Sequence, residues 1–186
     1  MEELDAALIE DADNRPDEQF PLTHPGRANT DAFREAMRSL AGAVSVITVG
    51  QGAARTGFTA SSVASFSVEP PTLIVSIDKS SSAWPAFKSA GRFCVNILAE
   101  GQSAIADRFA GRDGIKGAER FEGGDWRETP HGWALAGALV SLDCELEETI
   151  ERHSHAIVIG RVNAVTLGQL TAPLLYWHRA YRSLSD

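Results

Sequence analysis

Hydrophobic positions near the start of the chain follow a helical period. Four apolar residues recur at intervals of three and four positions: Phe33, Ala36, Met37 and Leu40. This spacing places them on one face of a helix. Thr30 can cap the first turn and Gly42 can end the last one, so we expect one short amphipathic helix here.

From residue 43 onward, β-branched and aromatic residues occur in short runs separated by turn residues. We expect strands at 44–49, 73–77, 93–98, 139–150 and 156–165. Two short helices are expected at 82–90 and 102–110, and the Gly-rich segment 111–132 is expected to be a loop. Helices this few and short cannot cover both faces of a parallel sheet. The pattern therefore predicts a mainly β fold, an antiparallel barrel with helices over its openings.

The composition is that of a globular protein, with 186 residues of which 44% are hydrophobic and 23% charged. The acidic charge is concentrated at one end of the chain. Residues 1–29 hold eight acidic side chains and two arginines, whereas the other 157 residues hold 17 acidic and 15 basic side chains. We therefore expect residues 1–29 to form a disordered acidic tail and residues 30–186 to form the folded domain.

Charge and hydropathy also exclude some classes of protein. A formal net charge of -8 argues against a nucleic-acid-binding protein, because neutralising phosphates requires concentrated Lys and Arg. No apolar run approaches the ~20 residues needed to cross a bilayer, and the acidic N-terminus does not resemble a signal peptide, so we expect a cytoplasmic protein with no membrane partner. Cys94 and Cys144 lie in apolar runs without a CxxC spacing, and we interpret both as reduced core residues.

Two short motifs could carry chemistry. Gly50-Gln51-Gly52 follows a strand, as a Rossmann phosphate loop does, but Arg55 occupies the third glycine position, so a hairpin turn is the better interpretation. His153 and His155 are two residues apart, and on one strand they would share a face and form half of a metal site. Because no further ligands accompany them, we expect no metal and favour a histidine that contacts another ligand.

The segment after Arg55 is unusually rich in hydroxyl groups: Thr56, Thr59, Ser61, Ser62, Ser65 and Ser67. It can be a polar edge strand, or small hydroxyl side chains beside Gly57 can let a heteroaromatic ligand approach the backbone. A second polar cluster, Asp78 to Ser82, precedes the predicted helix at 82–90. Its hydroxyl groups can cap this helix or bind a phosphate.

The chain resembles the flavin reductase family over about residues 33–181. The resemblance rests on motifs in the same order along the chain: Phe33-Arg-Glu-Ala-Met37, Gly42-Ala-Val-Ser-Val-Ile-Thr48, Gly57-Phe-Thr-Ala-Ser-Ser62, Glu69-Pro-Pro71, Gly91-Arg-Phe-Cys-Val-Asn-Ile-Leu98, Arg108-Phe109 and Pro173-Leu-Leu-Tyr-Trp-His-Arg-Ala-Tyr181. It implies an antiparallel Greek-key split β-barrel, the FMN-binding split-barrel fold. It also implies a homodimer that reduces FAD or FMN with NAD(P)H and supplies reduced flavin to a partner monooxygenase. Trp177-His178-Arg179 departs from the family, which commonly has an aromatic residue followed by Arg or Gly.

The resemblance also implies site residues. Those that would bind the flavin are Thr56, Gly57, Phe58, Thr59, Ser61, Ser62, Ser76, Asp78, Ser82, Ala83, Arg108 and Phe109, the last two near the flavin phosphate or adenylate. Those that would bind the nicotinamide dinucleotide are His153, Ser154 and His155, with His155 positioning the nicotinamide. No strong basic cluster awaits a 2′-phosphate, so NADH is favoured over NADPH. The alternative is a flavin-binding or electron-carrier protein of the same fold without nicotinamide turnover.

Overall fold

The computed structural model describes residues 29–184, so nearly all of the acidic tail expected at 1–29 lies outside the described residues. The chain divides into two units, Met1–Met37 and Arg38–Asp186. The predicted helix is present as α1 (Thr30–Arg38), but Thr30 is its first residue and not its cap, and it ends at Arg38, before Leu40 and Gly42. The Asn29 side chain accepts a hydrogen bond of 2.8 Å from the backbone N–H of Asp31, which satisfies a donor of the first turn.

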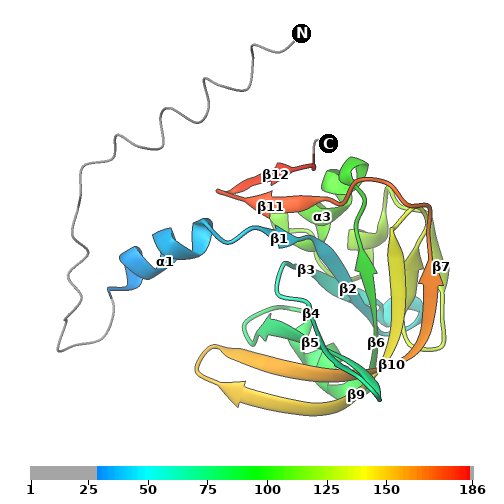
Figure 1. Cartoon of the computed structure of the whole chain (residues 1–186). Helices are drawn as coiled ribbons and strands as arrows, with labels where there is room; N and C mark the ends of the chain where they lie inside the picture. Colours follow the sequence, from blue (N-terminus) through cyan, green and yellow to red (C-terminus); the bar gives the residue numbers. More distant parts are fainter. Residues whose placement is uncertain (1–28, 185–186) are drawn as a thin grey trace, which may run out of the picture. The chain divides into compact units, whose positions relative to one another are not determined.

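The second unit is built on a seven-stranded antiparallel sheet, whose order is β3-β2-β6-β9-β10-β5-β4. Its strands are β2 (Ser45–Val49), β3 (Thr56–Ala60), β4 (Ala64–Val68), β5 (Pro71–Asp78), β6 (Arg92–Ile97), β9 (Val140–Arg152) and β10 (His155–Leu167). Figure 1 shows the β9–β10 hairpin, in yellow and orange, crossing the lower part of the view beside β4 and β5. The prediction of a mainly β, antiparallel fold with few short helices is confirmed.

The two ends of this sheet meet at a seam. Edge strands β3 and β4 are consecutive in the chain, and Ser62 lies in the connection between them. The Ser62 hydroxyl donates a hydrogen bond of 3.1 Å to the carbonyl oxygen of Ser76 and accepts one of 3.2 Å from its backbone N–H. These two hydrogen bonds link the β3–β4 connection to β5. Because the edge strands β3 and β4 do not pair with each other, the barrel closes only in part.

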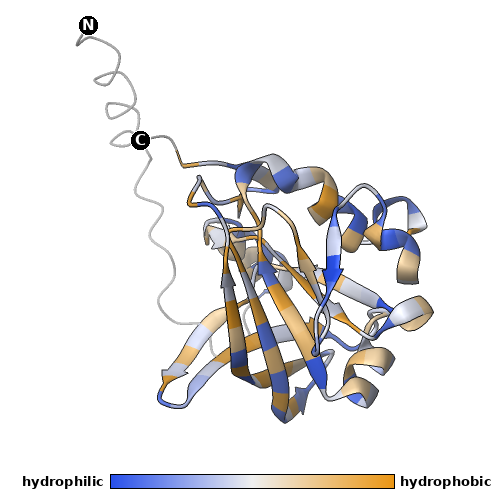
Figure 2. Cartoon of the chain, turned by 90° about the vertical axis from the view of Figure 1, so that its right-hand side faces the viewer, coloured by the Kyte–Doolittle hydropathy of each residue, from blue (hydrophilic) through white to orange (hydrophobic). Residues whose placement is uncertain are grey.

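Two hydrophobic clusters form the core of this unit. In one, Phe87 from helix α2 (Trp84–Ala90) packs on Phe93, with ring centroids 4.9 Å apart. In the other, Phe109 from helix α3 (Ser103–Phe109) packs on Phe121, with ring centroids 5.1 Å apart. Figure 2 shows hydrophobic and hydrophilic segments alternating along the strands, as expected of a sheet with one buried face. Each helix therefore anchors one side of the sheet.

The segment 111–132 contains more structure than the predicted loop. It holds the 3₁₀ turns η4 (Arg112–Gly114) and η5 (Gly117–Phe121) and strand β7 (Trp126–Glu128), which pairs with β8 (Trp133–Leu135). Ring contacts order it, since the centroid of Trp126 lies 5.2 Å from that of Phe109. This tertiary packing outweighs the local preference of the glycines for a flexible loop.

Several short elements complete the chain. Strands β1 (Gly42–Ala43), β11 (Leu175–Trp177) and β12 (Ala180–Arg182) form a small sheet, and η3 (Glu100–Gln102) leads into α3. The prediction of a hairpin turn after β2 is confirmed, because η2 (Gly52–Ala54) joins the antiparallel strands β2 and β3. Cys94 and Cys144 are buried and unpaired, as expected. Among residues 29–184, no helix is long and apolar enough to cross a membrane.

Candidate functional site

A cleft of about 420 Å³ lies between the seam of the sheet, the start of α2 and the end of α3. Eight of the sequence-predicted site residues line it: Phe58, Thr59, Ser62, Ser76, Asp78, Ser82, Phe109 and His155. Its volume is within the range of about 300–1,000 Å³ that is usual for small-molecule sites. The fold therefore brings residues of β3, β5, β10 and α3, which are far apart in the sequence, to one concave surface.

Seven predicted residues do not line this cleft: Thr56, Gly57, Ser61, Ala83, Arg108, His153 and Ser154. Thr56 and Ala83 are buried, and Ser61 is exposed. Arg108 pairs with the carboxylate of Glu122 at 2.9 Å and donates to a backbone carbonyl oxygen, so its guanidinium is engaged away from the cleft. The resemblance places Arg108 near the flavin phosphate or adenylate, and that placement stays a prediction.

Arg120, which sequence reasoning missed, lines the cleft instead. Its side chain is almost fully buried, and the guanidinium donates hydrogen bonds to the carbonyl oxygen of Gly57, to the Ser82 hydroxyl at 3.3 Å and to the carbonyl oxygen of Ile115 at 3.2 Å. None of these partners is a carboxylate. Burial lowers the pKa of Arg120, which reflects the cost of holding a charge there without an acidic partner. An anionic ligand in the cleft would supply the missing negative charge.

The wall beside Arg120 depends on Gly57. A Cβ atom added at Gly57 would lie 2.2 Å from the carbonyl oxygen of Ile47 and 2.8 Å from the ring of Phe109. Only glycine therefore lets β3 pass this close to its neighbours. Thr59, two residues on, donates a hydrogen bond of 2.5 Å to the carbonyl oxygen of Ala106 in α3. These contacts fix the position of Phe109, which forms part of the cleft surface.

A carboxylate and an imidazole also line the cleft. Asp78 and His155 are cross-strand partners in β5 and β10, and both line the cleft. The Asp78 carboxylate accepts hydrogen bonds of 2.8 Å from the backbone N–H and from the hydroxyl of Ser80, and these bonds lower its pKa. The Ser154 hydroxyl lies 2.9 Å from Nδ1 of His155. His155 is thus held at the edge of the cleft by its strand and by its neighbour.

His153 does not share a strand face with His155. It lies in the turn that joins β9 to β10, with a backbone φ of 50°, whereas His155 is the first residue of β10. The metal half-site considered for these two histidines required both on one strand, so that geometry is wrong. Among residues 29–184, no group of three or more His, Cys, Asp and Glu side chains is placed to hold a metal ion.

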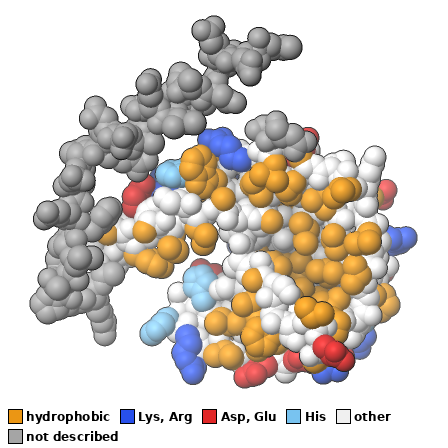
Figure 3. Space-filling model, in the orientation of Figure 1, with side chains coloured by type: hydrophobic (Ala, Val, Ile, Leu, Met, Phe, Trp, Pro, Cys, Tyr) orange, Lys and Arg blue, Asp and Glu red, His pale blue; other side chains and the backbone are white. Residues whose placement is uncertain are grey.

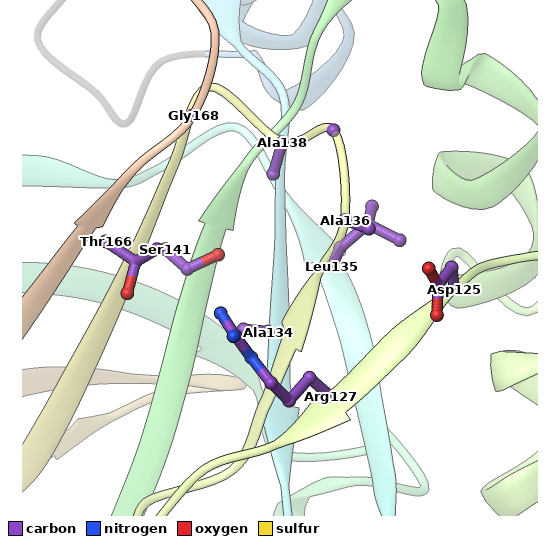
Figure 4. Close-up of a pocket in the computed structure, with 10 residues that line it drawn as sticks. Asp125, Arg127, Ala134, Leu135, Ala136, Ala138, Ser141, Thr166 and Gly168 are labelled. Carbon is purple, nitrogen blue, oxygen red and sulfur yellow. The ribbon is translucent and has the colours of Figure 1, made fainter.

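A second hollow, of about 390 Å³, lies beside β7, β8 and the start of β9. Figure 4 shows Arg127 reaching from β7 toward the side where Ser141 lies, with Asp125 on the other side. Three alanines, Ala134, Ala136 and Ala138, are among its lining residues. It contains none of the sequence-predicted site residues, so the cleft at Arg120 is the candidate site.

The fold and this cleft define a flavin-binding split barrel. Residues 37–185 match the flavin reductase like domain, and the chain belongs to that family. It is 45% identical over 157 residues to a protein of Methylorubrum extorquens named FMN reductase (NADH) RutF. The aligned region covers 82% of this chain and 74% of the relative. The resemblance stated from the sequence motifs is confirmed, and with it the assignment to the flavin reductases.

Solved structures of flavin reductases share this fold. BorF, the flavin reductase component of a bacterial two-component tryptophan halogenase, superposes with a TM-score of 0.78 at 26% identity, covering 85% of this chain and 99% of BorF. The NADH:FAD oxidoreductase SgcE6 of Streptomyces globisporus, solved in complex with NAD and FAD fragments, superposes with a TM-score of 0.75 at 26% identity, covering 82% of this chain and 91% of SgcE6. The split-barrel prediction is therefore confirmed.

Proposed function

We propose that the chain transfers a hydride from NADH to FMN and releases the reduced flavin to a separate flavin-dependent oxygenase. The observation that carries this proposal is the buried guanidinium of Arg120 in a cleft walled by aromatic and hydroxyl side chains. A flavin mononucleotide combines a planar ring with one terminal phosphate, so it matches both features of the cleft.

Different residues of the cleft would bind the phosphate and the ring system of the flavin. Arg120 and the Ser82 hydroxyl, 3.3 Å apart, would hold the phosphate in a charge-assisted contact. The hydroxyl of Ser62 would offer the ring system a hydrogen-bonding group at the seam, and Phe109, which Gly57 allows to pack against β3, would offer it an apolar surface. The flavin, when bound, supplies the electron-accepting ring, so the protein needs no nucleophile of its own.

His155 would orient the nicotinamide. Its imidazole lines the cleft beside Asp78, and one ring nitrogen is engaged by the Ser154 hydroxyl at 2.9 Å. The other nitrogen is available for a hydrogen bond to a carboxamide or phosphate oxygen of the dinucleotide. Hydride transfer requires close alignment of two rings and no proton from the protein, so the role of His155 is positional.

FMN is favoured over FAD by the more similar relatives. The M. extorquens relative, 45% identical, is named an FMN reductase, whereas SgcE6, 26% identical, is named an NADH:FAD oxidoreductase. The delivery of reduced flavin to an oxygenase is supported by BorF, a component of a two-component halogenase. A cytoplasmic location agrees with these partners and stays a prediction from the sequence.

We infer that the active form is a homodimer. Large apolar side chains are exposed at the end of β10 and just after it, with exposed fractions of 57% for Val165, 76% for Leu167 and 95% for Leu170. Figure 3 shows hydrophobic side chains gathered on the face where β6 and β10 lie in Figure 1. Burying such a patch against a second copy would remove it from water. Light scattering that reports a single 20.0 kDa chain at full activity would contradict this inference.

A turnover assay tests the proposed function. The protein is mixed with NADH and an excess of FMN, and the oxidation of NADH is followed by the loss of absorbance of the reduced nicotinamide. A reductase oxidises many equivalents of NADH per chain, whereas an electron carrier of the same fold oxidises one or none. Repeating the assay with FAD decides the flavin preference. Repeating it without residues 2–28 tests whether the acidic segment is dispensable, as its composition predicts.

A further inference from the structure

Two lysines and one glutamate form a charged cluster where β5 ends and the β9–β10 hairpin turns. The Glu151 carboxylate accepts hydrogen bonds from Lys88 Nζ at 3.0 Å and from Lys79 Nζ at 3.4 Å. Lys88 also lies over the ring of Trp84, with Nζ 5.4 Å from the ring centroid. One carboxylate therefore serves as the counter-charge of two ammonium groups that come from different elements.

This cluster borders the candidate active site. Lys79 stands between Asp78 and Ser80, both of which line the cleft. The backbone N–H of Lys79 donates a hydrogen bond of 2.9 Å to the carbonyl oxygen of Ser154, in the turn directly before His155. The lysine is thus attached to the hairpin that carries the proposed nicotinamide residue. Because Glu151 is the cross-strand partner of Ala156, the residue after His155, a dinucleotide held by His155 would bind beside this cluster.

The cluster contains the cations that a 2′-phosphate would require, although the sequence shows no compact basic motif. Lys79 and Lys88 are nine residues apart in the chain, and the turn into α2 brings both to Glu151. NADPH carries a doubly charged phosphate that NADH lacks, and basic side chains usually recognise it. Hydrogen bonds from Lys88 and Lys79 lower the pKa of Glu151, so the carboxylate is charged at neutral pH and occupies both ammonium groups.

We propose that Glu151 is a specificity-determining residue that makes this chain favour NADH over NADPH. By pairing with Lys79 and Lys88, it occupies both ammonium groups and cancels part of their positive charge, and its own charge repels a 2′-phosphate. The 2′-hydroxyl of NADH carries no charge and meets no such penalty. This inference rests on the proposed function, since it assumes that the nicotinamide binds at His155.

The test replaces Glu151 by glutamine, which keeps the shape of the side chain and removes its charge. In Glu151→Gln, the ratio of kcat/KM for NADPH to that for NADH should rise about tenfold, because both ammonium groups lose their counter-charge and can pair with the 2′-phosphate. The rise should disappear in about 1 M salt, where charges are screened within ~3 Å. Adding Lys79→Gln to this variant should return most of the ratio to its original value.

Glu148→Gln is the matched control. Glu148 lies on the same strand, is exposed and does not contact either lysine. Its replacement by glutamine changes the net charge of the protein by the same amount. The ratio should stay the same in this variant. A ratio that is unchanged in Glu151→Gln, or that rises equally in Glu148→Gln, overturns the inference. Wild-type protein that oxidises NADH in the presence of FMN separates this result from a failure of the proposed function, which would show as no turnover with either nucleotide.

Discussion

The guanidinium of Arg120 donates a hydrogen bond to the carbonyl oxygen of Gly57, 63 positions earlier in the chain. The same side chain also contacts the Ser82 hydroxyl at 3.3 Å, so one residue joins η5, β3 and the segment before α2. Arg120 therefore builds the wall of the cleft and gives it a positive charge. Binding of an anionic ligand at this wall would be coupled to the order of all three segments.

Replacing Arg120 by lysine should weaken the binding of FMN by about ten- to a hundredfold (~1.4–2.8 kcal/mol). The positive charge remains, but the planar guanidinium, which can donate two parallel hydrogen bonds to the phosphate, is lost. Riboflavin, which has no phosphate, should bind this variant nearly as well as it binds the wild type. Titration of flavin fluorescence measures both affinities. Equal losses for FMN and riboflavin would show that Arg120 supports the wall without contacting the phosphate.

Arg108→Lys is the control for this experiment. Arg108 also donates to a backbone carbonyl oxygen, but its charge is paired with Glu122 at 2.9 Å outside the cleft. Its replacement should leave the affinity for FMN within about twofold of the wild type, since exposed ion pairs contribute little. A larger loss in Arg108→Lys than in Arg120→Lys would indicate that Arg108, and not Arg120, contacts the phosphate.

Gly57→Ala should destabilise the folded protein by about 1–3 kcal/mol, because its new Cβ would lie 2.2 Å from the carbonyl oxygen of Ile47 and the two strands would have to move apart. Gly101→Ala serves as the comparison, since a Cβ at Gly101 has no neighbour within 4 Å. Chemical denaturation measures both free energies of unfolding. Equal stability of the two variants would mean that β3 relaxes at no cost.

The strands of the barrel could be predicted because their residues carry a local pattern. The run 156–165 consists mainly of β-branched and other apolar residues, and it lies within β10 (His155–Leu167). The strand expected at 139–150 likewise lies almost wholly within β9 (Val140–Arg152). By contrast, β8 (Trp133–Leu135) has three residues and pairs only with β7, so its signal is too short to stand out. Periodicity predicts long elements and misses those that depend on tertiary packing.

Sequence motifs identified some of the residues that line the candidate site, but not those that lie outside any motif. The hydroxyl-rich run supplied Thr59 and Ser62, and the family motifs supplied Phe109 and His155, all of which line the cleft. Arg120 lies in a glycine-rich segment whose residues show no period, and its importance comes from burial, which a sequence does not display. From the sequence, a single arginine in such a segment cannot be distinguished from an exposed, solvated arginine.

Neither cysteine should react with alkylating reagents in the folded protein. Burial raises the pKa of the Cys144 thiol to about 12, with a further contribution from the nearby carboxylate of Asp143, and burial also raises the pKa of Cys94. Since the thiolate is the reactive form, iodoacetamide at about pH 8 should label the native protein very slowly. Two thiols per chain should react after denaturation, as mass spectrometry would show. Rapid labelling of the native protein would indicate that β6 and β9 open locally.

His155→Ala tests the proposed position of the nicotinamide. We expect a higher KM for NADH and a kcat/KM lower by about ten- to a hundredfold (~1.4–2.8 kcal/mol), because the imidazole at the edge of the cleft would no longer align the dinucleotide. The affinity for flavin should change little, since the proposed phosphate contacts of the flavin are made by Arg120 and Ser82 and do not involve His155. Steady-state kinetics with NADH, together with flavin titration, separates the two effects.

His153→Asn is the control that the hairpin offers. His153 has a backbone φ of 50°, which asparagine tolerates well, so this variant removes the imidazole without straining the turn. Because His153 does not line the cleft, its kcat/KM for NADH should remain near that of the wild type. If the two variants lost activity equally and added metal restored either one, the positional role of His155 would be wrong. The pair of histidines would then act together, in a conformation of the turn that differs from the one described above.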